Sequence, residues 1–317
     1  MKLKEKIFSV ITLTAATTGA ISMINRFIFA KANSHVFPSQ SPSSLPSVFS
    51  WRFGRIRYRK YGDNGKPLLL VHSIHPLSSS YEWDRLIPLL TKEHTVFVLD
   101  LIGCGFSEKP AFLYTNFLYV QLINDFITDV IGRRTDVLCS GNASSAILMA
   151  CRNNDSLFDH ITMINPESIG DSMKIPSSAS RMLRYYYELP IIGTLGYNIA
   201  FSKRMVTEYL FKDMIGDHTS ICQADIEQFY NTAHLGGANC KRLYASLCGN
   251  YVNINITNAV RDINHSITII GGGKCSGISE CIQEFKQTNS SIESFIIKDA
   301  KQLPAFECPE LVAQYIF

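Results

Sequence analysis

The 317-residue sequence has little of what several functional classes require. Its net charge is only +3, from 30 Lys and Arg against 27 Asp and Glu, so it lacks the strongly basic character of proteins that bind nucleic acid. The nine cysteines form no Cys-x-x-Cys pair, and their odd number is unusual for an oxidised, exported domain. We therefore expect no nucleic-acid partner, no metal and no other cofactor, and most cysteines buried as small apolar side chains.

Charge is also missing from a long stretch near the N-terminus. Residues 7–24 contain no charged residue and follow three lysines, Lys2, Lys4 and Lys6. The stretch is close to the minimum length for crossing a bilayer, and its Ser and Thr residues dilute its hydrophobicity. No small-residue cleavage site follows it. For residues 1–31 three alternatives stay open: a membrane anchor, a helix packed on the protein, or a cleaved signal. The chain is accordingly expected to be membrane-associated or cytoplasmic.

The sequence pattern divides the rest of the chain into a linker, a core and an insertion. Residues 32–50 are rich in Ser and Pro and indicate a linker. From residue 51 onward, short apolar runs alternate with helical patterns, which predicts an α/β fold with a mostly parallel, doubly wound sheet. The predicted strands are 67–71, 95–99, 137–139, 160–164, 266–270 and 292–297. Between 170 and 257 the alternation is lost, and aromatic residues predict a helical cap between two core segments, 51–169 and 258–317.

Residues 136–150 are typical of a strand, a sharp turn and a helix. A strand that enters a helix through a turn of small residues has the layout of a nucleophile elbow, in which a strained turn raises a nucleophile above the sheet. In the frame Gly-x-x-x-small the turn covers residues 141–145, and the nucleophile position holds Ala143. A methyl group cannot attack a carbonyl carbon.

Further motifs flank this stretch at characteristic places. Asp100 opens the pattern Asp-x-x-Gly-x-Gly-x-Ser-x-x-Pro, which ends at Pro110, while His72 and Trp83 precede it and a Leu-Pro pair at 303–304 lies near the C-terminus. Together with the elbow, these motifs make the sequence similar to the α/β-hydrolase fold family. Within that family it resembles the branch of esterases, dehalogenases and epoxide hydrolases that carry a helical cap. The resemblance covers the chain from about Trp51 to the C-terminus and is weak in the cap.

The resemblance implies a catalytic triad in the order nucleophile, acid, histidine. In this sequence the nucleophile position holds Ala143, the acid position holds Cys275, and Gln302 precedes the Leu-Pro pair where the family has histidine. No histidine follows His265. A glutamine side chain cannot accept and return a proton near neutral pH. Substitutions at three separate motifs predict that triad chemistry is absent.

Other residues near these motifs are candidates for the site. The resemblance implies backbone donors for an oxyanion, and we expect the N–H groups of Ile74 and Ser144 to converge near Ala143. The remaining pocket candidates are His72, Ser73, Asn142 and Glu167.

Several of these candidates also have a structural explanation, which we favour. Ser144 and Ser145 could replace the nucleophile, or their hydroxyls could satisfy backbone donors at the start of a helix. Glu167 could serve as the acid, or as a solvated or capping carboxylate. Cys275 could become a reactive thiolate only beside a cation, for which Lys274 is the candidate.

The leading interpretation is a protein of the α/β-hydrolase fold that has lost catalysis. It would keep the cavity between sheet and cap as a site for a small apolar or ester-like ligand. Two alternatives stay open: a working hydrolase of a small ester or amide that uses a different set of residues, and a structural protein whose cavity has filled. Ester hydrolysis separates the first alternative from the leading interpretation, and a ligand-dependent rise in melting temperature separates the second.

Overall fold

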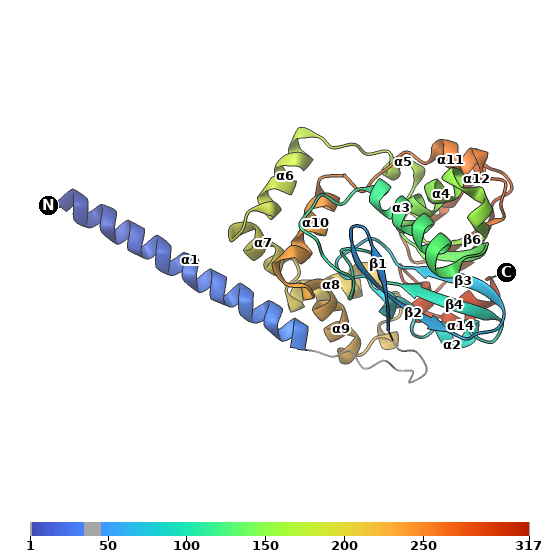
Figure 1. Ribbon diagram of the computed structural model, residues 1–317, viewed down its shortest axis with the longest axis horizontal. Helices are drawn as coiled ribbons and strands as arrows, with labels where there is room; N and C mark the ends of the chain where they lie inside the picture. The colour runs from blue at the N-terminus through green and yellow to red at the C-terminus, as the bar shows by residue number, and fades with distance from the viewer. Residues whose placement is uncertain (1, 35–45, 317) are drawn as a thin grey trace.

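A computed structural model describes residues 2–34 and 46–316, with side chains from residue 16 onward (Figure 1). Its centre is an eight-stranded sheet in the order β1-β2-β4-β3-β5-β6-β7-β8. β2 is antiparallel to β1 and β4, and the remaining neighbours are parallel. The strands are β1 Ser47–Trp51, β2 Gly54–Tyr61, β3 Lys66–Val71, β4 His94–Leu99, β5 Thr135–Ser140, β6 Phe158–Ile164, β7 Ile267–Gly272 and β8 Glu293–Ile297. The predicted doubly wound, mostly parallel sheet is confirmed.

The central strands are apolar on both faces because both faces of the sheet are covered. In β3, Leu69 and Val71 pack into the apolar layer on one face, and Leu68 and Leu70 pack into the layer on the other. Successive side chains of a strand point to opposite faces, so an unbroken apolar run is what two covered faces require.

Two groups of helices provide these covers, one on each side of the sheet in Figure 1. The larger group packs into the apolar layer around α4, and the smaller group packs on the opposite face. The larger group is α3 Asn116–Phe126, α4 Ala143–Asn153, α11 Thr257–Asp262 and α12 Ile278–Thr288, and the smaller is α2 Ile87–Leu90 and α14 Pro309–Gln314. Alternation of strands with helices on both faces explains the pattern in the sequence.

The sheet begins earlier in the chain than the sequence indicates. β1 pairs with β2 so that Ser47 lies opposite Tyr58, and residues 47–50 of the expected linker therefore belong to the sheet. A five-residue edge strand that alternates half-buried and exposed residues carries only a weak apolar signal. Residues 35–45 of the expected linker lie outside the described residues.

Between β6 and β7 the chain forms helices and no strand, in the region we call the helical insertion (residues 170–257). Its main helices are α6 Ser178–Glu188, α7 Ile192–Ala200, α8 Lys203–Tyr209, α9 Gln223–His234 and α10 Lys241–Cys248. Their apolar sides form a cluster that includes Tyr197, Phe201 and Phe229. Leu77 and Leu303, from the loops after β3 and β8, join the same cluster. The insertion thus packs on loops at the carboxyl ends of the strands.

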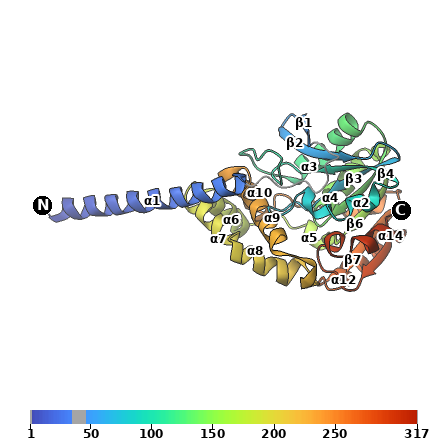
Figure 2. The same ribbon diagram turned by 90° about the horizontal axis from the view of Figure 1, so that it is seen from below.

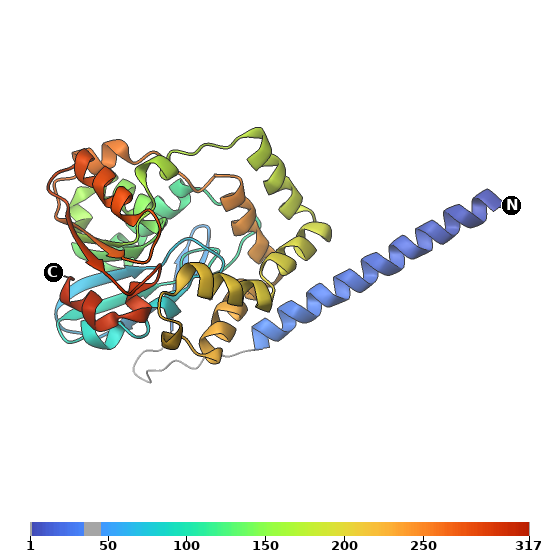
Figure 3. The same cartoon turned by 180° about the vertical axis from the view of Figure 1, so that it is seen from behind.

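The N-terminal residues form one long helix, α1 Lys2–Ser34, which extends away from the rest of the molecule (Figures 1, 2 and 3). Near its C-terminal end Asn25, Phe29 and Ala32 are buried, and their spacing places them on one face of the helix. This face contacts α7 and α9, and Asn198 Nδ2 donates a hydrogen bond to Asn25 Oδ1 at 2.7 Å. The end of α1 is therefore a packed helix. Among the residues whose side chains are described, no helix is long and apolar enough to span a bilayer.

Candidate functional site

In the turn after β5, Gly141 is the residue with a left-handed backbone conformation. Gly141 adopts φ +54°, a left-handed conformation that glycine tolerates best, and its N–H donates to Ile164 O at 2.9 Å. Ala143 is the first residue of α4 and is fully buried in the core. The apex of the turn is thus Gly141, two positions before the Ala143 that the sequence frame assigned. A small residue lies two positions after Gly141 and two positions after Ala143, so the sequence motif can be placed with either residue at the apex. The start of α4 at Ala143 decides in favour of Gly141.

Two cavities meet at this turn. The larger has a volume of about 690 Å³ and extends beneath α5 Ile169–Ser172 and α12, whereas the smaller, of about 210 Å³, is closed by the helical insertion. Four residues line both cavities and form the wall between them. They are Ser73, Gly141, Asn142 and Gln302.

Two of the residues assigned to triad positions are in direct contact. Cys275 Sγ donates a hydrogen bond to Gln302 Oε1 at 3.0 Å, although the residues lie on separate loops after β7 and β8. Burial raises the pKa of the Cys275 thiol, so the thiol stays protonated near neutral pH. Gln302 is held by its backbone, whose N–H donates to Met214 O and whose carbonyl accepts from Asn165 Nδ2. The pair lies beside Gly141 in the wall of the larger cavity.

The Asn142 side chain accepts a hydrogen bond from Ile74 N, one of the two backbone donors that were expected to bind an oxyanion. Its Oδ1 accepts hydrogen bonds from Ile74 N at 2.8 Å and from Ser73 Oγ at 3.0 Å, while its Nδ2 donates to Ile74 O at 3.2 Å. The Ser144 N–H donates instead to Gly141 O at 3.2 Å, within the first turn of α4. The two expected donors therefore serve two different oxygens, because the helix begins at Ala143 and carries Ser144 away from the apex.

Ser73 fills the space in which a side chain at the apex would lie. A Cβ atom added to Gly141 would come within 2.6 Å of Ser73 Oγ and 3.1 Å of Ser73 Cβ. Contacts below about 3.0 Å are essentially never seen for real Cβ atoms, so the Ser73 hydroxyl, the end of a flexible side chain, would have to move. The sequence indicated Ser73 as a pocket candidate, but not that it packs against position 141.

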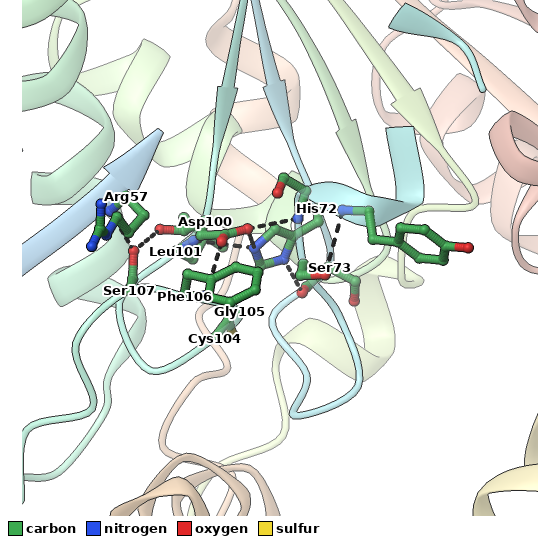
Figure 4. A network of polar contacts seen from close by, with 12 residues as sticks. Arg57, His72, Ser73, Asp100, Leu101, Cys104, Gly105, Phe106 and Ser107 are labelled. Carbon is green, nitrogen blue, oxygen red and sulfur yellow. Dashed lines mark hydrogen bonds and ion pairs between the residues drawn. The ribbon is translucent and has the colours of Figure 1, made fainter. Parts of the chain in front are cut away.

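His72 belongs to the framework beneath the site (Figure 4). Its Nε2 accepts a hydrogen bond from Leu101 N at 3.1 Å and its Nδ1 donates to Ser73 O at 2.8 Å, so both ring nitrogens are in use. The ring is fully buried, and burial lowers its pKa. A neutral imidazole with two backbone partners orients the loop after β3 and is not free to exchange a proton with a ligand.

The two serines after the apex do not face either cavity. Ser144 and Ser145 are both buried, and Ser144 Oγ accepts a hydrogen bond from Cys139 Sγ at 3.6 Å. Ser145 Oγ donates to Glu167 Oε1 at 2.6 Å. Glu167 itself lines the larger cavity, so Ser145 serves to hold this carboxylate. Both hydroxyls thus bond other side chains, and not the backbone donors at the start of the helix that the structural explanation assigned to them.

Burial raises the pKa of Glu167 to about 7, against a smaller opposing effect of the Ser145 hydrogen bond. The unfolded chain ionises near the ordinary value of 4.5, so between these pH values the native state binds more protons. Stability should therefore fall as pH rises through this window. We expect Glu167→Gln to make this fall in unfolding free energy smaller by about 1–3 kcal/mol, as measured by urea titrations at a series of pH values.

The matched control is Glu280→Gln, which alters an exposed carboxylate of the same cavity. Burial also raises the pKa of Glu82 to about 7, and this group stays in both variants. The comparison with the parent therefore isolates Glu167. Equal pH dependence in the parent and in Glu167→Gln would contradict the assignment.

The smaller cavity contains residues that the sequence did not single out. His75 lies in its wall, its ring stacked on Tyr209 with centroids 5.9 Å apart. Burial lowers the pKa of His75 to about 4, so the ring is neutral, and its Nδ1 accepts from Leu77 N at 3.3 Å. The ring proton is therefore on Nε2. Tyr244 of α10 completes the aromatic wall. These side chains meet only through the fold of the insertion, which explains why no local pattern indicated them.

One group of acidic and imidazole side chains among the described residues is close enough to share a cation. Asp136, Asp159 and His160 have ligand atoms within 4.8 Å of one another, at the opposite end of the strands from the cavities. The Lys66 ammonium already lies 2.7 Å from Asp136 and 2.5 Å from Asp159. Lysine thus supplies the positive charge at this cluster.

Comparisons with known proteins agree with the fold. Residues 66–179 match the family of the α/β-hydrolase fold. The chain is 32% identical over 72 residues to a 2-hydroxy-6-oxo-6-(2'-aminophenyl)hexa-2,4-dienoic acid hydrolase of Metapseudomonas resinovorans, a match that covers 22% of this chain and 24% of that protein. It is 45% identical over 56 residues to a soluble epoxide hydrolase of Corynebacterium sp. (strain C12), covering 18% of each. The sequence match thus spans about a quarter of the first relative's length.

Solved structures extend the likeness over nearly the whole chain. A serine hydrolase involved in carbazole degradation superposes with a TM-score of 0.70 at 17% identity, covering 86% of this chain and 96% of that one. A membrane phospholipase A superposes with a TM-score of 0.68 at 16% identity, covering 98% of this chain and 96% of that one. The protein therefore has the α/β-hydrolase fold, and residues 66–179 carry the sequence features of that family.

Proposed function

We propose that this protein is a catalytically silent relative of the α/β hydrolases that binds a small molecule beside its former active site. The observation that carries the proposal is the contact of Cys275 with Gln302 next to Gly141. The family resemblance assigns the acid position to Cys275 and the histidine position to Gln302, and the conformation of the turn favours Gly141 over Ala143 as the nucleophile position. Glycine offers no attacking atom, the thiol is protonated, and the amide cannot relay a proton.

Two further contacts support the loss of catalysis. The Asn142 carboxamide takes the Ile74 N–H, which would otherwise bind an oxyanion, and Ser73 takes the space of a nucleophile side chain. An oxyanion site stabilises a transition state only if its donors are free to meet the developing charge. Here at least one donor is satisfied before any ligand arrives.

The smaller cavity suggests the kind of ligand. Its wall combines aromatic and apolar side chains with the neutral His75, whose Nε2–H is a donor, and with a few other polar residues: Ser73, Ser78, Ser140, Asn142 and Gln302. Pockets with mostly apolar walls and a few placed polar groups bind small, largely apolar molecules and orient them by their polar atoms. A compact ketone or ester with one acceptor oxygen fits this cavity, with the insertion acting as the cap over it.

The test combines hydrolysis with thermal unfolding. We expect no hydrolysis of 4-nitrophenyl acetate or butyrate, and a rise in melting temperature of roughly 5 °C with acetophenone at about 100 times its Kd. Leu247→Trp fills the smaller cavity and should abolish the rise, whereas Leu311→Trp, at an exposed site on α14, should preserve it. Hydrolysis by the parent would instead support the alternative of a working hydrolase with a different set of residues. A parent that neither hydrolyses nor responds to acetophenone would contradict the binding role.

We also propose that α1 associates with a membrane. The uncharged stretch at residues 7–24 lies on the part of the helix that extends away from the molecule. In support, the structural match to the membrane phospholipase A covers 98% of this chain and so extends over α1. Flotation of the full chain with vesicles tests this proposal, and a protein that stays at the bottom of the gradient contradicts it.

A further inference from the structure

The outer face of the helical insertion exposes an unusual number of large apolar side chains. None of the residues of α6 is buried. Met182, Tyr185 and Leu189 are 71%, 58% and 47% exposed, and their spacing places them on one face of the helix. Ile192 and Ile199 of α7 are 57% and 60% exposed and share a face in the same way. We call these five residues the α6–α7 surface.

Close to the α6–α7 surface, α1 also exposes large apolar side chains. The hydrogen bond between Asn198 and Asn25 joins α7 to α1 next to Ile199. Met23 and Phe27 of α1 lie two positions either side of Asn25, on the opposite face of the helix, and are 68% and 71% exposed. Figures 1 and 3 show α6 and α7 on the side of the molecule toward which α1 extends. The insertion and the free end of α1 therefore face the same direction.

The charges around this surface are predominantly basic. Along the described side chains of α1, α6 and α7, the basic residues are Arg26, Lys31, Arg181 and Arg184, and the one acidic residue is Glu188. Glu188 forms an ion pair with Arg184 at 3.1 Å, so the excess basic charge comes from the other three residues. A surface of exposed Met, Ile, Leu and Tyr with a basic surround matches the boundary between anionic headgroups and acyl chains. Tyrosine in particular favours this boundary because its ring is apolar and its hydroxyl is polar.

We infer that the α6–α7 surface rests on an anionic phospholipid bilayer, with α1 entering or lying along the same membrane. A second copy of the chain fits less well, because two such basic surfaces would repel each other when brought face to face. The contact places the insertion, which closes the smaller cavity, against the lipid. The inference does not depend on whether the site catalyses, and it goes beyond association through α1 alone.

The test places a tryptophan in the surface of the full-length protein. The two native tryptophans, Trp51 and Trp83, are 7% and 0% exposed, so a new surface tryptophan can be distinguished from them. We expect the emission of Tyr185→Trp to shift to shorter wavelength on vesicles of phosphatidylcholine and phosphatidylglycerol, and to be quenched when the acyl chains are brominated. The matched control is Phe117→Trp, at a residue of α3 that is 68% exposed. Its emission should not change.

A double substitution tests the affinity of the same surface. Met182→Glu combined with Ile199→Glu should weaken the partitioning of the full chain into these vesicles by about tenfold or more. Each change removes an apolar side chain that would be buried among the acyl chains. Raised salt should also weaken binding, since the basic surround is screened. The inference is overturned if Tyr185→Trp is unaffected by brominated lipid, or if Phe117→Trp is quenched equally, which would mean non-specific adsorption. The inference is also overturned if the Tyr185→Trp emission lies at short wavelength before vesicles are added and light scattering gives the mass of a dimer. That result would identify a second copy of the chain as the partner.

Discussion

A variant that combines Ser73→Gly, Gly141→Ser, Cys275→Asp and Gln302→His is expected to hydrolyse an activated ester, whereas each single variant is expected to match the parent, which we propose to be inactive. Gly141→Ser alone places a hydroxyl at the apex, but its Cβ collides with Ser73. Gln302→His alone supplies a base with nothing to activate. The combined variant removes the collision and restores nucleophile, base and orienting acid. We expect a rate about 10²–10⁴ times that of the parent, since the triad members act as a unit.

The matched control for this experiment is Ala143→Ser in place of Gly141→Ser. Ala143 is fully buried in the core, so a serine there cannot reach a ligand in either cavity. We therefore expect the set that contains Ala143→Ser to stay inactive, as measured by release of 4-nitrophenol from 4-nitrophenyl butyrate. Activity in that set, with none in the Gly141→Ser set, would show that the apex is Ala143.

Asp100→Ala should be the most destabilising of the substitutions considered. The buried carboxylate accepts hydrogen bonds from Ser80 N at 2.6 Å and Phe106 N at 2.9 Å, and its backbone oxygen accepts from Ser107 Oγ at 2.5 Å (Figure 4). Loss of the carboxylate removes the partner of the buried Ser80 N–H, breaks the bond from Phe106 N and leaves a cavity beside Gly105, so unfolding free energy should fall by about 3–5 kcal/mol.

Urea unfolding at neutral pH measures this loss. Asp63→Ala serves as the control, because its side chain is 88% exposed and its ion pair with Lys60 lies at the surface. The control should change the unfolding free energy by less than about 1 kcal/mol. Similar effects of the two substitutions would mean that Asp100 does not stabilise the loop after β4.

The sheet could be predicted because its chemistry is local. Leu68 to Val71 are all apolar, and only a strand covered on both faces requires such a run. The pattern that begins at Asp100 was likewise informative. Its glycines are required by close packing, since a Cβ at Gly105 would come within 2.5 Å of the Asp100 carboxyl carbon. The contact of Cys275 with Gln302 follows from two motifs whose places in the fold are fixed by the strands before them.

The remainder depends on contacts between distant segments. Asn142 binds Ile74 across 68 residues of sequence, and Asn198 binds Asn25 across 173. No periodic pattern in the sequence indicates such pairs. The apex at Gly141 was missed because small residues surround it on both sides, so the sequence fits two frames equally well. Only the helix that starts at Ala143 removes the ambiguity.

The central claim is that the turn after β5 presents no nucleophile. It is tested most directly by treating the full-length parent with an excess of a fluorophosphonate and, separately, of an activated ester, and then measuring its intact mass. We expect an unchanged mass in both cases, because Gly141 has no side chain, Ser144 and Ser145 are buried, and the Cys275 thiol is protonated. A mass increase that maps to Ser144, Ser145 or Cys275 and is accompanied by turnover would contradict it.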